Sequence, residues 1–273
     1  MAKGPVGDWY KDARNTQGLL LDIFGVLYEN GDEGPVVIPG SIEAVKKLKD
    51  AGIPVRFCTN NSTKTKAGLA KILLDLGFDV SESQLFPPPP AVSHVLKARN
   101  LRPYLIVMPD VLPQFADIAQ TEPNCVVLGD AQTHFTYDNM NRAFQVLLSC
   151  PNPVLIAMGG GKYYQEAGEM KLDVGPFAKA LEFASGIEAE IIGKPSKTFF
   201  LAALSDMGFS TDKVVMIGDD IISDVGGAQA CGIRGVQVRT GKYRPRDEPH
   251  ASVTPDGYVD NLLQAVDLFL AHR

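Results

Sequence analysis

Two apolar runs in this sequence end in aspartate. Residues 18–21 are followed by Asp22, and residues 214–217 are followed, after one glycine, by Asp219. Uninterrupted apolar runs of this length are typical of parallel strands that are buried on both faces. Because an unpaired carboxylate is costly to bury inside a strand, we expect each aspartate at the carboxyl end of its strand, where open α/β sheets bind ligands. The two ends therefore predict one cluster of carboxylates, which suits a hard cation such as Mg²⁺.

Two other segments carry groups that bind phosphate. The predicted strand at residues 54–58 is followed by Thr59 and Asn60, and the short apolar run 191–193 is followed by Lys194. The turn after Thr59 precedes a predicted helix, so its backbone N–H groups are free to face an anion. A hydroxyl, such N–H groups and an ammonium can together hold one phosphoryl group, and a carboxylate beside them is a candidate nucleophile.

These four segments, taken in this order, resemble the motifs of the haloacid dehalogenase superfamily of aspartate-nucleophile phosphatases. Each motif alone is weak, but four in the right order and spacing are strong. The resemblance covers almost the whole chain. It is greatest to the subgroup with a large cap between the threonine and lysine motifs, and within it to phosphatases of pyrophosphate, phospholysine and phosphohistidine. The four motifs are residues 22–26, 59–62, 193–195 and 218–220 with Asp224, and the closer match rests on residues 138–147, 172–176 and 238–244.

The resemblance implies a role for specific residues. It implies that Asp22 forms an aspartyl-phosphate, that Lys194 neutralises charge in the transition state, and that Thr59 hydrogen-bonds a phosphoryl oxygen. The backbone N–H of Asn60 would bind beside Thr59. A small phosphorylated compound is the implied substrate. The implied Mg²⁺ ligands are Asp22, Asp219, Asp224 and the backbone carbonyl of Phe24, and the implied substrate contacts in the core are Asp22, Phe24, Thr59, Asn60 and Lys194.

The acids after the second strand have open alternatives. Asp224 would coordinate the metal through water or orient Lys194, and it equally suits a helix N-terminus, where the helix dipole favours an acid. Asp220 is a less certain ligand than Asp219. Both roles of Asp224 can hold together.

The glycine run 159–161 is followed by Lys162, Tyr163 and Tyr164. It is not a P-loop, because Ile156 stands where the first glycine of that motif belongs and Tyr163 stands where a serine or threonine should hold magnesium. We expect a cap loop that faces the active site, with Lys162 and Tyr163 as substrate contacts and Tyr164 as a further candidate.

Phe24 departs from the superfamily pattern. The position two residues after the nucleophile is usually an aspartate that protonates the leaving group and later activates water. Phenylalanine can do neither, although its backbone carbonyl can still bind a metal. Substrates whose leaving groups need little help, such as pyrophosphate, P–N compounds and aryl phosphates, would suffer least. The alternative is a catalytically weak protein that binds a phosphate ligand.

Strand and helix patterns alternate along the chain, which predicts an α/β fold with a doubly wound, Rossmann-like parallel core sheet. Four prolines at residues 87–90 interrupt the pattern, and because proline disrupts both helix and sheet we expect a stiff connector or hinge there. The predicted domains are a core of residues 1–86 plus 189–273 and an inserted α/β cap domain of residues 87–188. Predicted core strands are 19–22, 55–59, 190–193, 214–218 and 235–238, predicted core helices are 41–51, 64–77, 198–207, 224–230 and 260–271, and predicted cap strands are 104–108, 125–128 and 154–158.

Composition sets limits on partners and location. The 273 residues carry a formal net charge of −6 and no basic block, which argues against nucleic acid or an anionic membrane as a partner. No apolar run reaches the roughly 20 residues of a membrane span, and the polar amino terminus is not a signal peptide. The four cysteines are scattered, as expected of reduced thiols in a cytoplasmic protein. A dinucleotide-binding oxidoreductase is disfavoured, since the first strand does not lead into G-x-G-x-x-G. We expect a homodimer that forms through the cap.

Overall fold

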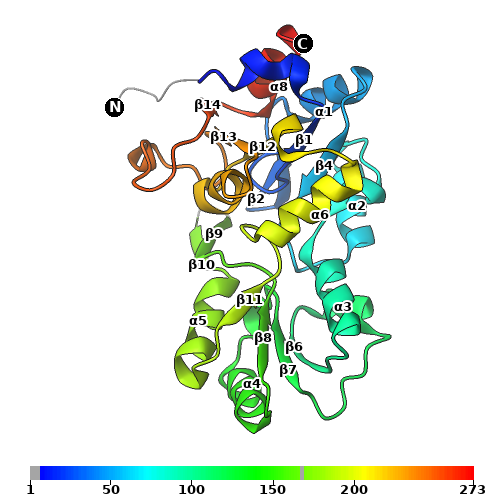
Figure 1. The fold of residues 1–273 in the computed structure, drawn as a ribbon, viewed down its shortest axis with the longest axis vertical. Coiled ribbons are helices and arrows are strands. Elements are labelled where there is room, and N and C mark those ends of the chain that lie inside the picture. Colours follow the sequence, from blue (N-terminus) through cyan, green and yellow to red (C-terminus); the bar gives the residue numbers. More distant parts are fainter. Residues whose placement is uncertain (1–6, 167–168) are drawn as a thin grey trace.

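A six-stranded parallel sheet forms the core of the computed structural model, which describes residues 7–166 and 169–273 (Figure 1). β1 (Gly18–Leu21) lies inside this sheet, between β12 (Val214–Gly218) and β4 (Val55–Cys58). The fold confirms the predicted doubly wound, Rossmann-like parallel sheet. The outer strands are β13 (Arg234–Val238) and β14 (Gly257–Val259) beyond β12, and β5 (Leu85–Phe86) beyond β4.

Three consecutive leucines, which point alternately to the two faces of the sheet, explain why β1 is buried on both faces. Leu19 and Leu21 pack into one apolar cluster, and Leu20 packs into another cluster on the opposite face, as the two-residue period of a strand requires. Helices cover both of these faces. The first cluster includes residues of α1 (Ser41–Asp50), α2 (Lys66–Asp75) and α8 (Leu262–Ala271), and the second includes residues of α6 (Lys197–Met207) and α7 (Gly227–Gln229).

The carboxyl ends of β1 and β12 are neighbours at one edge of the core sheet. From β1 the chain proceeds to β4 on one side, whereas β12, on the other side, follows the long inserted segment. Such a reversal of strand order leaves a crevice at the strand ends, which is where open α/β sheets bind ligands. Asp22 and Asp219 directly follow these two strands, as the sequence predicted.

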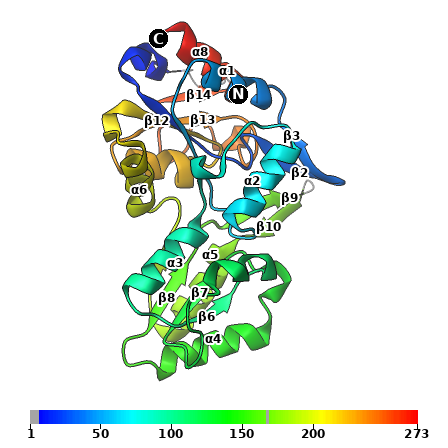
Figure 2. The same cartoon turned by 90° about the vertical axis from the view of Figure 1, so that its right-hand side faces the viewer.

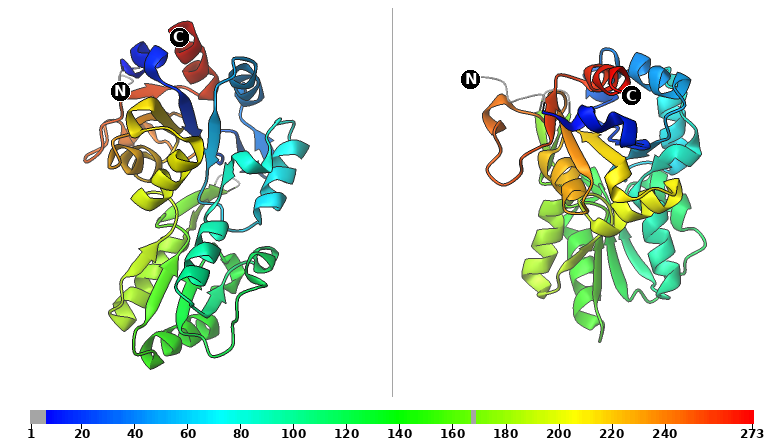
Figure 3. Two further views of the ribbon diagram at one scale, coloured as in Figure 1. Left: turned by 45° about the vertical axis from the view of Figure 1, so that its right-hand side comes forward. Right: turned by 45° about the horizontal axis from the view of Figure 1, so that its top comes forward.

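The inserted segment has its own four-stranded parallel sheet among the described residues, and it lies below the core in Figures 1 and 2. We call residues 88–191, which contain this sheet, the cap. Helices cover both faces of the cap sheet (Figure 3). The strand order is β11 (Ala189–Ile191), β8 (Val154–Ala157), β7 (Cys125–Leu128) and β6 (Pro103–Ile106), with α4 (Tyr137–Ser149) and α5 (Val174–Ser185) on one face and α3 (Pro88–Ala98) on the other.

β11 belongs to the sheet of the inserted segment and not to the core sheet. The sequence pattern assigns residues 190–193 to a core strand, but β11 hydrogen-bonds in parallel to β8 of the cap sheet. This correction has a simple cause. A strand of three residues, partly exposed along its length, carries no periodic pattern that would identify the sheet to which it belongs.

The proline run forms the first turn of a helix, not the predicted connector. Pro87 is the residue before α3, and Pro88 and Pro89 are its first two residues. Because the first N–H groups of a helix have no intrahelical acceptor, proline loses no hydrogen bond there, and its fixed φ suits the helix. Only Pro87 lies between β5 and α3.

The segment after β12 forms a wide helical turn, not the predicted α-helix over residues 224–230. Ile221–Gly226 is π-helical, and the α-helical part that follows is α7. Asp220 caps this turn by accepting hydrogen bonds from the N–H groups of Ile222 and Ser223 at 3.0 and 2.9 Å. Wide turns of this kind are rare and are frequent at functional sites.

Two antiparallel hairpins meet between the core and the cap. β2 (Tyr28–Gly31) pairs with β3 (Gly34–Val37) in the core, and β9 (Tyr163–Glu166) pairs with β10 (Glu169–Leu172) in the cap. β2 lies against β9, so the two parts of the chain touch beside the hairpins (Figure 2). None of the described helices is both long and apolar enough to cross a membrane.

Candidate active site

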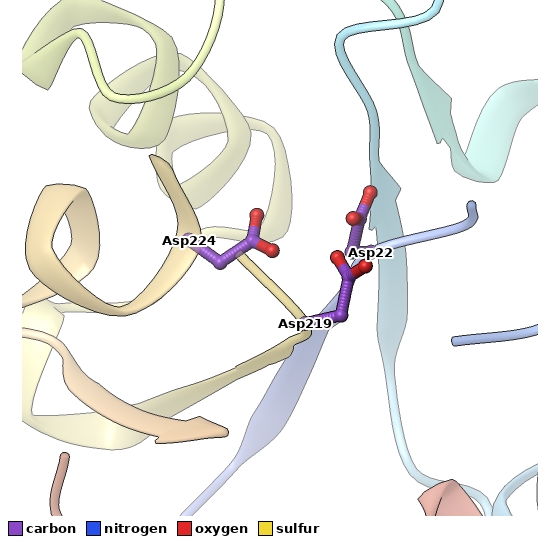
Figure 4. Close-up of side chains that lie close together, drawn as sticks. All are labelled: Asp22, Asp219 and Asp224. Atoms are coloured by element: carbon purple, nitrogen blue, oxygen red, sulfur yellow. The ribbon is translucent and has the colours of Figure 1, made fainter. Parts of the chain in front are cut away.

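Three buried carboxylates meet at the ends of β1 and β12. Asp22 follows β1, Asp219 follows β12, and Asp224 projects from the π-helical turn toward the other two (Figure 4). Each offers a carboxylate oxygen, and these oxygens all lie within 4.8 Å of one another. The convergence of Asp22 and Asp219 that the two strand ends predicted is therefore confirmed.

Lys194 bridges two of these carboxylates. Its Nζ lies 2.7 Å from Oδ1 of Asp22 and 2.6 Å from Oδ1 of Asp224, and all three side chains are buried. Burial alone would lower the pKa of Lys194, but the charges of Asp22 and Asp224 outweigh it and raise that pKa above its ordinary value. Lys194 therefore stays an ammonium, and its contact with Asp224 is the one that the predicted orienting role of Asp224 would need.

The negative charge of the clustered carboxylates exceeds the positive charge of the groups that pair with them. Burial and the charge of Asp22 raise the pKa of Asp219 well above its usual range, and the same two causes raise the pKa of Asp224 to about 7 against the opposing effect of Lys194. Within the described residues, Lys194 pairs with Asp22 and Asp224 and leaves Asp219, the third buried carboxylate of the cluster, without a direct contact to its ammonium. The neighbouring carboxylates raise the pKa of Lys194, whereas burial and the charge of Asp22 raise the pKa of Asp224 in spite of its ion pair with Lys194. An oxygen-only donor set with excess negative charge fits a hard divalent cation.

Two glycines allow the backbone to close around Asp219. A Cβ atom added at Gly25 or Gly241 would lie 2.2 or 2.1 Å from Oδ2 of Asp219, and both glycines have positive φ, +82° and +60°. The same Oδ2 accepts a hydrogen bond from the N–H of Lys242 at 2.7 Å. Any larger residue at either glycine would collide with the carboxylate or with the backbone behind it, so this close approach requires glycine.

Asp220 serves the helical turn and an ion pair with a second lysine. Its Oδ2 lies 3.0 Å from Nζ of Lys242, while its Oδ1 caps the π-helical turn. Burial would raise the pKa of Asp220, but Lys242 and the N–H donors outweigh burial and lower that pKa to about 2. These contacts give Asp220 a structural function distinct from that of the three clustered acids.

The turn after β4 supplies the predicted hydroxyl and a contact that was not predicted. Thr59 is buried, and its Oγ1 accepts a hydrogen bond from the N–H of Asn61 at 3.1 Å. The side chain of Asn60 forms two hydrogen bonds with the backbone of Lys194. Its Nδ2 donates to the Lys194 carbonyl at 2.8 Å, and its Oδ1 accepts from the Lys194 N–H at 2.7 Å. Asn60 therefore holds the lysine segment through its side chain, whereas the resemblance implies only its backbone N–H.

Phe24 is half-buried and lines the same cavity as Asp22, Thr59 and Lys194. Its ring packs edge-on against Tyr28, with centroids 5.8 Å apart. Burial and then the charge of Asp22 raise the pKa of Tyr28 to about 12, so this phenol stays neutral. Phe24 thus brings an apolar ring, and no titratable group, to the position where the superfamily usually has an acid.

The catalytic cavity has a volume of about 140 Å³ and lies between the core and the cap. The cap wall is formed by Asp130, Gln132, Tyr164 and Asp173. The predicted contacts Lys162 and Tyr163 line a neighbouring cavity of about 250 Å³, where Arg244 lies over the Tyr163 ring at 5.0 Å. Asp219, Asp220, Ser223 and Lys242 border both cavities.

Sequence reasoning did not identify three residues at this site. Lys242 holds Asp219 and Asp220, Asp173 lines the cavity from the cap, and the buried Ser62 accepts a hydrogen bond from the cap N–H of Asp130 at 2.8 Å. Each lies within a segment that carried the family resemblance. Their location in these segments could have marked them as candidates, but it does not indicate which side chain of a segment reaches the site.

Comparisons with known proteins agree with this geometry. The haloacid dehalogenase-like hydrolase family matches residues 19–120, and a second, HAD-hydrolase-like family matches residues 191–265. The chain is 53% identical over 264 residues to the phospholysine phosphohistidine inorganic pyrophosphate phosphatase of Homo sapiens, with 97% of this chain and 98% of that protein covered. It is 39% identical to haloacid dehalogenase-like hydrolase domain-containing protein 2 of Bos taurus, with 95% and 98% covered.

A solved structure extends the comparison to three dimensions. The 4-nitrophenylphosphatase of Thermotoga maritima is similar with a TM-score of 0.84 and 25% identity, and the alignment covers 94% of this chain and 98% of that one. The relatives therefore match almost the whole chain, core and cap included. Together these findings show that the chain belongs to the haloacid dehalogenase-like hydrolases and that it is a phosphatase.

Proposed function

We propose that this chain is a magnesium-dependent phosphatase that transfers the phosphoryl group of a small phosphorylated compound first to Asp22 and then to water. The observation that carries the proposal is the position of Lys194, whose Nζ contacts both Asp22 and Asp224 beside Asp219 in one buried cluster. This arrangement combines a carboxylate, a fixed positive charge and further oxygen ligands within one small cavity.

The hydrogen bonds favour particular atoms for the reaction. Oδ1 of Asp22 accepts from the N–H of Ile23 at 2.7 Å and from Lys194, so we assign the attack on phosphorus to Oδ2. Because Oγ1 of Thr59 accepts the Asn61 N–H, its own proton is available for a phosphoryl oxygen. The bond between phosphorus and the leaving group breaks as the Asp22–phosphorus bond forms, and water then attacks the phosphorus, releasing phosphate and restoring Asp22.

Mg²⁺ would be held by Asp22 and Asp219, with Asp224 and the backbone carbonyl of Phe24 as further ligands. When bound, the ion would screen the repulsion between the carboxylate nucleophile and the phosphoryl group. The excess negative charge of the cluster, expressed in the raised pKa values of Asp219 and Asp224, supports this assignment.

The substrates that we propose are pyrophosphate and P–N compounds such as phospholysine and phosphohistidine. The similar human protein is named for these substrates, and the cavity of about 140 Å³ suits a small compound. Phe24 supplies no proton, so leaving groups that need little protonation are favoured. Lys162 and Tyr163, in the adjoining cavity, stay proposed contacts for larger leaving groups.

The second candidate function is a catalytically weak protein that binds a phosphate ligand, and Phe24 is the observation that favours it. Turnover separates the two. The purified chain, given 4-nitrophenyl phosphate or pyrophosphate, should release product in the presence of Mg²⁺ and stop after chelation with EDTA. Binding of phosphate without catalytic turnover on any of these substrates, in a folded and Mg²⁺-supplied protein, would favour the binding protein.

A cytoplasmic location and a homodimer through the cap also belong to this proposal. The reduced state of the four cysteines, three of which are buried, supports a reducing compartment. Large apolar side chains on the cap helices support the dimer: Phe183 on α5 is 92% exposed and Tyr137 on α4 is 80% exposed. We propose that these two side chains contribute to a contact surface on the cap.

A further inference from the structure

Asp173 lies on the cap wall of the catalytic cavity, opposite the groups that hold the phosphoryl group. It precedes α5, and its Oδ1 accepts the N–H of Val174 at 2.7 Å, so the carboxylate is fixed at the start of that helix. Asp22, Thr59 and Lys194 all come from the core. If those core groups hold the phosphoryl group, the part of the substrate that departs meets the cap, and Asp173 with it.

The glycine run 159–161 leaves the space that the Asp173 carboxylate occupies. A Cβ atom added at Gly161 would lie 2.0 Å from Oδ2 of Asp173, and one added at Gly175 would lie 2.5 Å from the Gly161 carbonyl oxygen. The N–H of Gly175 also donates to that carbonyl at 3.0 Å. The loop and the start of α5 are therefore packed directly on each other, and the Asp173 carboxylate is held in position beside the cavity.

The charges around the cavity disfavour a second anion. The two lysines that line it already have carboxylate partners: Lys194 pairs with Asp22 and Asp224, and Lys242 pairs with Asp220 at 3.0 Å. Lys242 also attracts the Asp173 carboxylate, but its effect on Asp220, with which it forms the ion pair, is stronger. Like charges in a confined site repel, and an opposite charge is attracted. Of the aspartates that line the cavity, Asp22, Asp219 and Asp224 would hold Mg²⁺, and the two on the cap side are Asp130 and Asp173.

We infer that Asp173 makes this enzyme prefer N-phosphorylated amines, whose leaving nitrogen carries a positive charge, over pyrophosphate, whose leaving group is an anion. The inference rests on the proposed function of the same site. It also explains how the chain can catalyse the reaction although position 24 carries phenylalanine in place of the usual acid. A protonated phosphoramidate nitrogen already holds its proton, so when the P–N bond breaks the nitrogen keeps the bonding electron pair and leaves as a neutral amine. Asp173 favours that protonated form by its charge.

The test compares two substrates in two variants. In Asp173→Asn the side-chain oxygen can still accept the Val174 N–H, so the change removes charge and keeps the helix cap. The ratio of kcat/KM for N-phospholysine to kcat/KM for pyrophosphate should fall by about 10-fold, which is the order expected for one unit charge in a partly solvated site. Glu188→Gln is the matched control, because this exposed residue lies just beyond the far end of α5, and its ratio should equal that of the parent.

The outcomes separate this inference from the function on which it rests. An unchanged ratio in folded Asp173→Asn, with active parent enzyme, overturns the role of Asp173 and leaves the phosphatase proposal intact. A ratio that changes in Lys162→Met but not in Asp173→Asn also overturns it, because the leaving group would then occupy the neighbouring cavity. Absence of Mg²⁺-dependent turnover in the parent on every substrate instead contradicts the proposed function itself.

Discussion

Phe24 lines the catalytic cavity without offering a proton. Its half-buried ring packs on Tyr28, whose raised pKa keeps the phenol neutral near neutral pH. Asp22, the proposed nucleophile, is in contact with the ammonium of Lys194, so in the proposed mechanism the departure at Phe24 affects proton transfer and not the binding of the phosphoryl group. The proposal therefore predicts a specific dependence of rate on the leaving group.

Replacement of Phe24 by aspartate should reduce that dependence. Across aryl and alkyl phosphates of graded leaving-group pKa, the parent should lose rate steeply as the leaving group becomes more basic. Phe24→Asp should recover alkyl phosphate turnover by up to roughly 10²–10⁴-fold, the usual value of general acid–base help. Phe24→Leu, which brings no proton, is the control. Equal slopes of log kcat/KM against leaving-group pKa in Phe24→Asp and the parent, both folded and metal-competent, would show that another group already donates the proton.

The turn after β4 and the segment after β11 are held together at the catalytic lysine. Asn60 bonds both the N–H and the carbonyl of Lys194, and Ser62 in the same turn binds the cap at Asp130. Gly193, next to the lysine, has no room for a side chain, since an added Cβ would lie 2.8 Å from Oδ1 of Asn60. One short turn of the core therefore positions both the lysine segment and the cap.

Loss of the Asn60 side chain should affect activity more than substrate binding. Asn60→Ala removes two hydrogen bonds and leaves the Lys194 backbone groups unpaired, which should lower the free energy of unfolding by about 1–3 kcal/mol. Because the ammonium acts mainly in the transition state, kcat should fall while KM changes little. Asn60→Asp retains the acceptor and should be intermediate in stability. Parent-like kcat and unfolding free energy in Asn60→Ala, from urea titration, would remove Asn60 from the positioning of Lys194.

Sequence patterns predicted the elements whose residues carry a strong period or a strong chemical constraint. The buried runs of β1 and β12, and the acids that follow them, lie where the sequence predicted, because desolvation leaves a strand-end carboxylate few alternatives. Three elements were predicted incorrectly. The prolines start α3, β11 joins the cap sheet, and Asp224 lies on a π-helical turn. The proline start follows a local rule for the first turn of a helix, whereas the sheet that β11 joins depends on long-range packing that no local pattern records.

The same limit applied to the site. Asp22 and Asp219 were predictable because they follow strands that end at one edge of the core sheet. Lys194 was predicted from its motif in the family pattern, although β11, the strand before it, belongs to the cap sheet. Asp173 and Lys242 reach the cavity from the cap and from the loop after β13, and their approach depends on how the two parts of the chain pack. Lys162 and Tyr163 illustrate the converse, since adjacency to a glycine loop predicted the general region but not the cavity that they line.

The molecule as a whole divides the work between its two parts. The core supplies the clustered carboxylates and the lysine, and the cap supplies the opposite wall of a small cavity. A substrate held between the two parts is shielded from water during phosphoryl transfer. The outer surface of the cap carries a different feature, the exposed aromatic side chain of Phe183 on α5.

Phe183→Asp should weaken the proposed cap-mediated dimer. A charge in an apolar contact surface costs desolvation energy and brings two like charges together across a symmetric interface. Light scattering coupled to size-exclusion chromatography should report a dimer mass for the parent and a monomer mass for Phe183→Asp. Leu74→Asp, which alters an exposed apolar residue of the core helix α2, should remain dimeric. A dimer that persists in Phe183→Asp would place the interface elsewhere.

The central claim is that Asp22 carries the phosphoryl group, and the most direct measurement is to trap it there. Enzyme mixed with Mg²⁺ and 4-nitrophenyl phosphate is quenched in acid during turnover, digested, and analysed by mass spectrometry. We predict a peptide spanning residues 18–28 with the mass of one added phosphoryl group, located on Asp22 and lost on mild alkaline treatment. Asp22→Asn should fold, bind phosphate, and show neither the modified peptide nor turnover. Turnover in purified Asp22→Asn, or a phosphoryl group found on another residue in the parent, would contradict the account.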